Sequence, residues 1–162
     1  MMRKLLLAQG LALGIGLAAL PLPALGQAAS DLQLEGFVQV ESVIVDERGA
    51  PQRGWSEPVT VIPGDLLRMG TRYTNGGANV IENFVISNPV PPAVRVSAVP
   101  DPVQIVSVDG GQSWGPFAGQ IVRGADGTAR PAAPEDITHL RWTIAAVPPG
   151  SSGMVEYAAI VR

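Results

Sequence analysis

The sequence predicts an all-β protein, an antiparallel β-sandwich of about seven strands. Apolar and polar residues alternate with a period of two in short runs along most of the chain. Gly, Pro, Asn and Asp separate these runs, as expected of strands joined by turns. No segment after residue 30 keeps the apolar spacing of a helix over three turns. Seven short strands of this kind are typical of two packed antiparallel sheets.

The first 26 residues have the layout of a signal peptide, which we expect to form a signal helix before the sandwich. Arg3 and Lys4 precede an uncharged apolar run, and Ala24-Leu25-Gly26 supplies small residues for cleavage. A membrane anchor is the competing interpretation, but Pro21 and Pro23 interrupt the run that such a helix needs. We therefore expect a periplasmic or secreted protein with no membrane span after cleavage, and a short linker over residues 27–34. Cleavage after Ala28 is the alternative.

Composition excludes several kinds of partner and chemistry. Once Arg3 and Lys4 are removed, nine arginines stand against fourteen acidic residues, a net charge of −5. Because no basic stripe is present, we expect no binding to nucleic acid or to anionic lipid. The chain has no cysteine, which excludes disulfides, a thiol nucleophile and thiolate metal sites.

The predicted strands follow one another in the order of the alternating runs. In 138–147 the alternation places Leu140, Trp142 and Ile144 on one face, which we expect to be core. In the last strand Val155, Tyr157, Ala159 and Val161 share a face, with the Tyr157 hydroxyl near the rim of the core. The predicted strands are 36–45, 66–74, 79–87, 93–99, 103–108, 138–147 and 154–162.

The segments between the strands predict two hairpins and two long loops. "TNGGAN" (74–79) has the residues of a tight turn, so the strands on either side are expected to pair antiparallel. "PPGSSG" (148–153) is expected to join the last two strands in the same way. Residues 123–136 are polar and Pro-rich, which predicts a mobile loop. Residues 46–58 form a second predicted loop, which carries Trp55.

Three segments resemble a bacterial family known as domain of unknown function 11. They are "VIPGD" (61–65), "RYTNGG" (72–77) and "NFVISNPVPPAVRV" (83–96). The resemblance implies an Ig-like β-sandwich over residues 35–162 and a location outside the cytoplasm. The family often has Asp before its Pro-x-Pro element, where this chain has Ser87 and Asn88, and its module usually recurs in tandem. It has no agreed catalytic residues, so the resemblance implies no active site.

"SVDGGQSW" (107–114) matches the Asp-box of sialidase-like propellers. In that motif an Asp accepts hydrogen bonds from its own turn while glycines adopt left-handed angles. A propeller needs the motif in several blades, and here it occurs once. We therefore predict that Asp109, Gly111 and Trp114 stabilise a hairpin, and draw no sugar-hydrolase inference.

Catalytic and metal sites find little support in the sequence. His139 is the only histidine, and no Gly-x-Ser-x-Gly elbow accompanies it. Four loop acids remain as candidates for glycoside cleavage or for calcium, if their loops converge. We expect them to be solvated surface groups, and so no enzyme, no cofactor and no bound metal. These acids are Asp109, Asp126, Glu135 and Asp136.

Two function classes are left. The first is a non-catalytic module that has a structural or protein-interaction role, with an envelope or surface protein as partner. The second is a module that binds a ligand, of which a carbohydrate is the most plausible class because loop tryptophans stack on sugars and acids hydrogen-bond to them. Trp55 and Trp114 are the predicted contact residues in either case. Their exposure should discriminate between the two.

Overall fold

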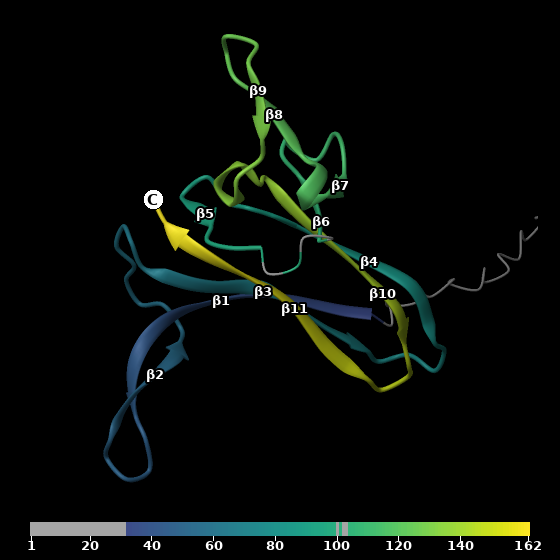
Figure 1. The fold of residues 1–162 in the computed structure, drawn as a ribbon. Coiled ribbons are helices and arrows are strands. Elements are labelled where there is room, and N and C mark those ends of the chain that lie inside the picture. The colour runs from purple at the N-terminus through teal and green to yellow at the C-terminus, as the bar shows by residue number, and fades with distance from the viewer. Residues whose placement is uncertain (1–31, 100, 102–103) are drawn as a thin grey trace, which may run out of the picture.

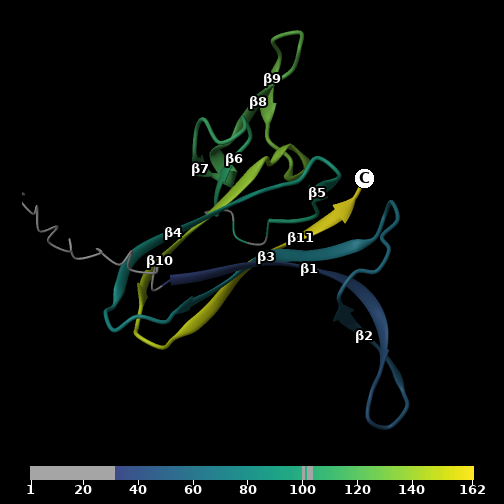
Figure 2. The same ribbon diagram turned by 180° about the vertical axis from the view of Figure 1, so that it is seen from behind.

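The computed structural model describes residues 32–99, 101 and 104–162. It confirms an all-β fold in which every strand pairing is antiparallel (Figures 1 and 2). The five-stranded sheet has the order β2 (Pro51–Ser56), β1 (Leu32–Val45), β3 (Leu66–Asn75), β11 (Ser152–Val161), β5 (Val94–Val96). The four-stranded sheet has the order β4 (Ile81–Pro89), β10 (His139–Val147), β6 (Ile105–Ser107), β7 (Gly115–Pro116). β8 (Ile121–Arg123) and β9 (Ala129–Pro131) form a separate ribbon, and Phe117–Gly119 and Pro134–Asp136 are short 3-10 helices.

The two larger sheets share one hydrophobic core, which gives the molecule the layers of a β-sandwich. Both sheets contribute buried side chains, and the apolar surface removed from water is the main stabilising contribution. The core cluster consists of Leu67, Val94, Val96, Val106, Ile137, Leu140, Tyr157 and Ala159.

The predicted inner faces of the last two strands agree with the structure except at Ile144, which is only partly buried and lies outside the core cluster. Leu140 is buried and Trp142 packs against the core cluster. Val155, Tyr157 and Ala159 are buried along β11. The Tyr157 hydroxyl donates a hydrogen bond to the Pro89 carbonyl oxygen at 3.4 Å, and burial raises the pKa of Tyr157 to about 12.

Neither predicted hairpin forms. β3 and β4 lie in different sheets, so "TNGGAN" carries the chain from one layer to the other. β10 and β11 also lie in different sheets, so "PPGSSG" is a second crossover. Turn residues indicate where the chain can reverse, but burial of the apolar faces decides which strand each neighbour pairs with.

Both predicted long loops contain strands. Within 46–58, the chain turns at Asp46–Gly49 and returns as β2, which pairs with β1 from Val40 to Val45. Within 123–136, β9 pairs with β8 across a turn at Asp126–Gly127. β2 is an edge strand and the β8–β9 ribbon lies outside the larger sheets, so neither needs the apolar alternation on which strand prediction depends.

Strand ends also differ from the prediction. β1 begins at Leu32, within the predicted linker, and the predicted strand 103–108 is reduced to β6. The predicted signal peptide and its cleavage site lie outside the described residues. No helix in the described ranges is long and apolar enough to cross a bilayer.

Candidate binding sites

Asp109 organises the turn that contains the Asp-box. Its Oδ1 accepts hydrogen bonds from the N–H groups of Gln112 at 3.0 Å and Ser113 at 2.9 Å. The Ser113 hydroxyl donates to Oδ2 at 2.5 Å, and the Ser107 hydroxyl donates to Oδ1 at 2.7 Å. These hydrogen bonds, that of the Ser113 side chain foremost, hold the pKa of Asp109 well below its ordinary value. The carboxylate is therefore already saturated with donors from its own turn.

The same turn is attached to the strand that follows the β8–β9 ribbon. The Thr138 hydroxyl donates to the Ser107 carbonyl oxygen at 3.1 Å and accepts from the Gly110 N–H at 3.0 Å. Gly110 and Gly111 have φ angles of 78° and 86°, which a side chain would disfavour. The arrangement therefore orders a local turn and leaves no open carboxylate for catalysis.

Trp114 lies over this turn, with its ring between two polar neighbours. Its Nε1 donates to the Gly111 carbonyl oxygen at 2.9 Å. The guanidinium carbon of Arg141 is 3.5 Å from the ring centroid, and the His139 ring approaches edge-on at 5.9 Å. Because Arg141 occupies the ring face, that face is not free to stack on a sugar.

The other candidate acids are not brought together. Asp126 accepts hydrogen bonds from Thr128 within the β8–β9 turn, which lower its pKa. Asp136 forms a two-point ion pair with Arg130, at 2.6 and 2.7 Å, which lowers the pKa of Asp136. The described residues contain no group of three or more acidic or histidine side chains placed to hold a metal ion. Asp126 is thus engaged by its own turn, and Asp136 by Arg130.

His139 stays outside any catalytic arrangement of the described residues. Its Nδ1 lies 3.1 Å from the Thr138 hydroxyl, and its ring packs against Trp114. Both neighbours belong to the Asp-box turn or to the segment attached to it. The geometry gives His139 a packing role in this corner of the molecule.

Trp55 lies at the edge of a cavity of about 460 Å³ on the side of the sandwich where β11 extends beyond β5. Its floor is apolar and aromatic, and its rim carries polar side chains. A cavity of this composition is typical of a small-ligand site. The lining comprises Trp55, Arg68, Ala98, Val99, Asp101, Gln104, Leu140, Trp142, Glu156, Tyr157 and Ala158.

Arg68 is the cation of this cavity, and its position is fixed from three directions. Its guanidinium carbon is 5.1 Å from the centroid of the Trp55 ring. Its Nε and Nη2 donate to Gln39 Oε1 at 3.1 and 2.5 Å. The carboxylate of Glu156 is 3.7 Å from Nε. The rim thus presents a held guanidinium beside an acid, which is suited to hydroxyl or amide ligands.

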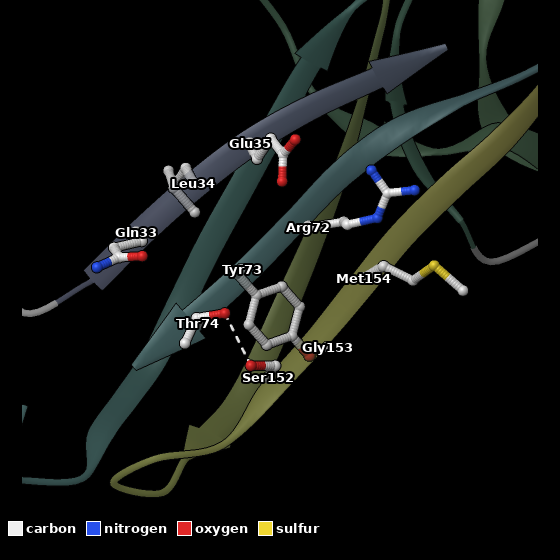
Figure 3. Close-up of a pocket in the computed structure, with 9 residues that line it drawn as sticks. All are labelled: Gln33, Leu34, Glu35, Arg72, Tyr73, Thr74, Ser152, Gly153 and Met154. Atoms are coloured by element: carbon white, nitrogen blue, oxygen red, sulfur yellow. Dashed lines mark hydrogen bonds between the residues drawn. The ribbon is translucent and has the colours of Figure 1, made fainter. Parts of the chain in front are cut away.

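A second depression, of about 570 Å³, lies over the ends of β1, β3 and β11 (Figure 3). The Tyr73 ring covers Gly153, where a Cβ would overlap the ring. Thr74 and Ser152 are joined by a hydroxyl hydrogen bond of 2.7 Å. Met154 is 54% exposed on this surface, which also carries the polar side chains of Gln33, Glu35 and Arg72.

Sequence reasoning identified Trp55 but missed the residues around it. Arg68 and Glu156 occupy outward positions of β3 and β11. Single charged residues are common at such positions, so they do not indicate a binding site in the sequence. Trp142 was predicted as core, and it also lines the cavity. Only the pairing of β1 with β2 brings Trp55 to Arg68, and that pairing was not predicted.

Comparison with known proteins assigns the chain to no family. No family model, no curated protein and no solved structure matches the chain.

Proposed function

We propose that this chain is an exported, non-catalytic Ig-like module, periplasmic or secreted, with a structural or protein-interaction role in the bacterial envelope or exterior. The proposal rests first on the segment that resembles a signal peptide and on the likeness to domain of unknown function 11. The saturated Asp109 turn and the dispersed acids support a non-catalytic role.

The observation that carries the interaction role is the apolar surface of the β1–β2 hairpin. This hairpin extends away from the core (Figure 1), and Val43 and Val45 near its tip are 72% and 68% exposed. Val59, in the loop after β2, is 99% exposed. Apolar side chains gathered on a projecting element favour contact with another protein, because burying them in an interface releases water.

In-cell crosslinking of a C-terminally tagged chain tests the proposal. The expected result is one dominant protein partner in the envelope or external fraction, with capture reduced in a Val43→Lys, Val45→Lys variant. Ile121→Lys, a change at a 54% exposed residue of β8, is the matched control and should capture as well as the parent. Equal capture by all three proteins would show that the hairpin is not the contact surface, and no protein captured at all would contradict the interaction role.

A second candidate function is binding of a carbohydrate or another small ligand in the cavity beside Trp55. It is favoured by the aromatic floor of Trp142 and Tyr157 and by the polar rim of Arg68 and Glu156. Aromatic rings offer apolar faces to sugar rings, while the rim offers hydrogen-bond donors and acceptors.

A glycan array followed by calorimetry tests this candidate. Binding of a glycan should be lost in Trp55→Ala and retained in Trp114→Leu, because Arg141 already covers the Trp114 ring. Binding that survives Trp55→Ala, or absence of any glycan ligand on the array, would count against the cavity as a sugar site.

A further inference from the structure

β4 is an edge strand of the four-stranded sheet. It pairs with β10 on one side, and no described residue pairs with it on the other. Edge strands present main-chain donors and acceptors that another strand can use. β4 spans nine residues, from Ile81 to Pro89, which is longer than the other strands of its sheet apart from β10.

The phase of the β4–β10 ladder identifies which groups of β4 are free. The Val90 N–H donates to the Thr138 carbonyl oxygen, in register with the ladder. Alternate residues of an antiparallel strand direct their N–H and C=O groups to opposite sides. Val85 and Ser87, at odd positions, therefore direct these groups away from β10, toward the open edge. The kink at Asn83, whose φ is 52°, interrupts the edge before them.

Apolar side chains of β1 lie uncovered on the inner face of the five-stranded sheet. Leu34 is 56% exposed and Val38 is 37% exposed. Each lies opposite a residue of β3 that faces the other sheet. Leu34 pairs with Tyr73, whose ring contacts Phe84 of β4, and Val38 pairs with Met69, which packs on the core. Within the described ranges, the four-stranded sheet stops at β4 and places no strand over this part of β1.

The free edge and the uncovered face belong to one groove. Thr71 of β3 donates to Asn88 of β4 at 2.9 Å, which places β4 above β3 and its open edge toward β1. A hollow of about 270 Å³ joins Val38 and Met69 to Asn88 and Pro89 at the end of β4. The groove, defined by the β4 edge from Val85 to Pro89 and by Leu34 and Val38 of β1, is where a fifth strand of the smaller sheet would lie.

We propose that this groove binds an extended segment of a partner protein by strand addition to β4. The segment would exchange main-chain hydrogen bonds with Val85 and Ser87, and would place alternate apolar side chains over Leu34 and Val38. The outward N–H and C=O groups of β4 favour a strand as the ligand over a helix or a sugar. Only a strand has a main chain that can pair with a row of alternating donors and acceptors. This inference rests on the proposed protein-interaction role and specifies its partner.

A second folded copy fits the groove poorly. Beside the groove, β1 extends the larger sheet one strand beyond β3, about 5 Å at the usual strand spacing, because β2 pairs only with Val40–Val45 of β1. A second copy that brought its own β4 against this edge would meet that extension with its own larger sheet. A single strand enters the space without this conflict, so the occupant is an extended segment.

A displayed library of random peptides of about twelve residues, long enough to span β4, tests the proposal on the purified full chain. Selected peptides should have apolar residues at alternate positions. Binding should weaken about tenfold or more in Val85→Pro, which removes an outward N–H without removing a β4–β10 hydrogen bond. Leu34→Lys should weaken it as much, and Ile121→Lys, a residue of similar exposure on β8, should not.

Amide hydrogen exchange followed by NMR gives an independent readout that does not require any variant to fold. The amides of Val85 and Ser87 should become protected when a selected peptide binds. Unchanged exchange at both amides, failure to select any peptide, or a dimer of the chain that Val85→Pro dissociates would each overturn the proposal. Peptide binding at β4 without a partner captured in cells would instead contradict only the proposed cellular role.

Discussion

The side-chain amide of Asn75 donates a hydrogen bond to the main-chain carbonyl oxygen of Val147, 2.8 Å away, and joins the end of β3 to the end of β10. The same amide donates to the Asn79 carbonyl oxygen at 2.8 Å, and Asn75 Oδ1 accepts from the Gly77 N–H. The Asn75 main chain also exchanges hydrogen bonds with Gly150 and Ser151. One fully buried asparagine therefore connects the two segments that cross between the sheets.

Replacing Asn75 with Ala should destabilise the fold by about 2–4 kcal/mol, because the Val147 and Asn79 carbonyl oxygens lose their donor and a buried cavity remains. Urea unfolding followed by circular dichroism measures this loss. Asn79→Ala is the control, since Asn79 is exposed and contributes only its main-chain oxygen. A loss of stability no larger than that of the control would show that the Asn75 side chain does not hold the crossovers.

Gly70→Ala should destabilise the chain by about 2 kcal/mol or more, because the added methyl group would overlap the Val155 carbonyl oxygen and crowd the Glu156 Cα. Phe37 packs against the same position from β1. Gly36→Ala is a matched control, since its nearest neighbour would be the Gly70 carbonyl oxygen at 4.0 Å. Urea unfolding of both variants tests this explanation. Equal urea concentrations at the two unfolding midpoints would contradict it.

The strand content could be predicted from the sequence because alternation reflects burial of one face. β10 and β11 illustrate this, since Leu140, Tyr157 and Ala159 are buried as their spacing indicates. Strand pairing could not be predicted in the same way. Asn75-Gly76 has the residues of a hairpin turn, yet the five residues after Asn75 cross to the other sheet, because a chain of that length can span the roughly 10 Å between layers.

The candidate sites also differ in how far they can be predicted from the sequence. The hydrogen bonds around Asp109 arise within seven consecutive residues, so a local motif suffices to predict them. The cavity beside Trp55 combines β2, β3, β10 and β11. The edge position of β4 among the described strands likewise depends on the order in which distant strands pair. Both sites arise from long-range pairing, which a single sequence does not specify.

The Asp109 turn should make stability depend on pH in the acid range. A carboxylate whose pKa is lower in the folded state stabilises the fold above its ordinary pKa of 3.8, and this contribution is lost as the pH falls below that value. Asp109→Asn should therefore lower stability at neutral pH and reduce the loss that the parent suffers below about pH 4. Thermal unfolding at a series of pH values measures both effects. Glu57→Gln, in an exposed loop, controls for the change in net charge.

The contact between Arg141 and Trp114 should be measurable as a coupling energy of about 0.5–1 kcal/mol, because the guanidinium lies 3.5 Å over the ring. The measurement is a double-mutant cycle of Arg141→Ala and Trp114→Leu by urea unfolding. Arg141 also donates to the Ser87 hydroxyl, and the cycle separates that bond from the ring contact.

The same contact should control solvent access to the indole. Arg141→Ala should increase acrylamide quenching of tryptophan fluorescence, because the ring face that the guanidinium covers becomes open. Arg123→Ala, on the separate β8–β9 ribbon, is the control and should leave quenching unchanged. A coupling energy of zero with unchanged quenching would show that the Trp114 face is free in solution. Trp114 would then again be a candidate sugar-stacking residue, in addition to the aromatic side chains of the cavity beside Trp55.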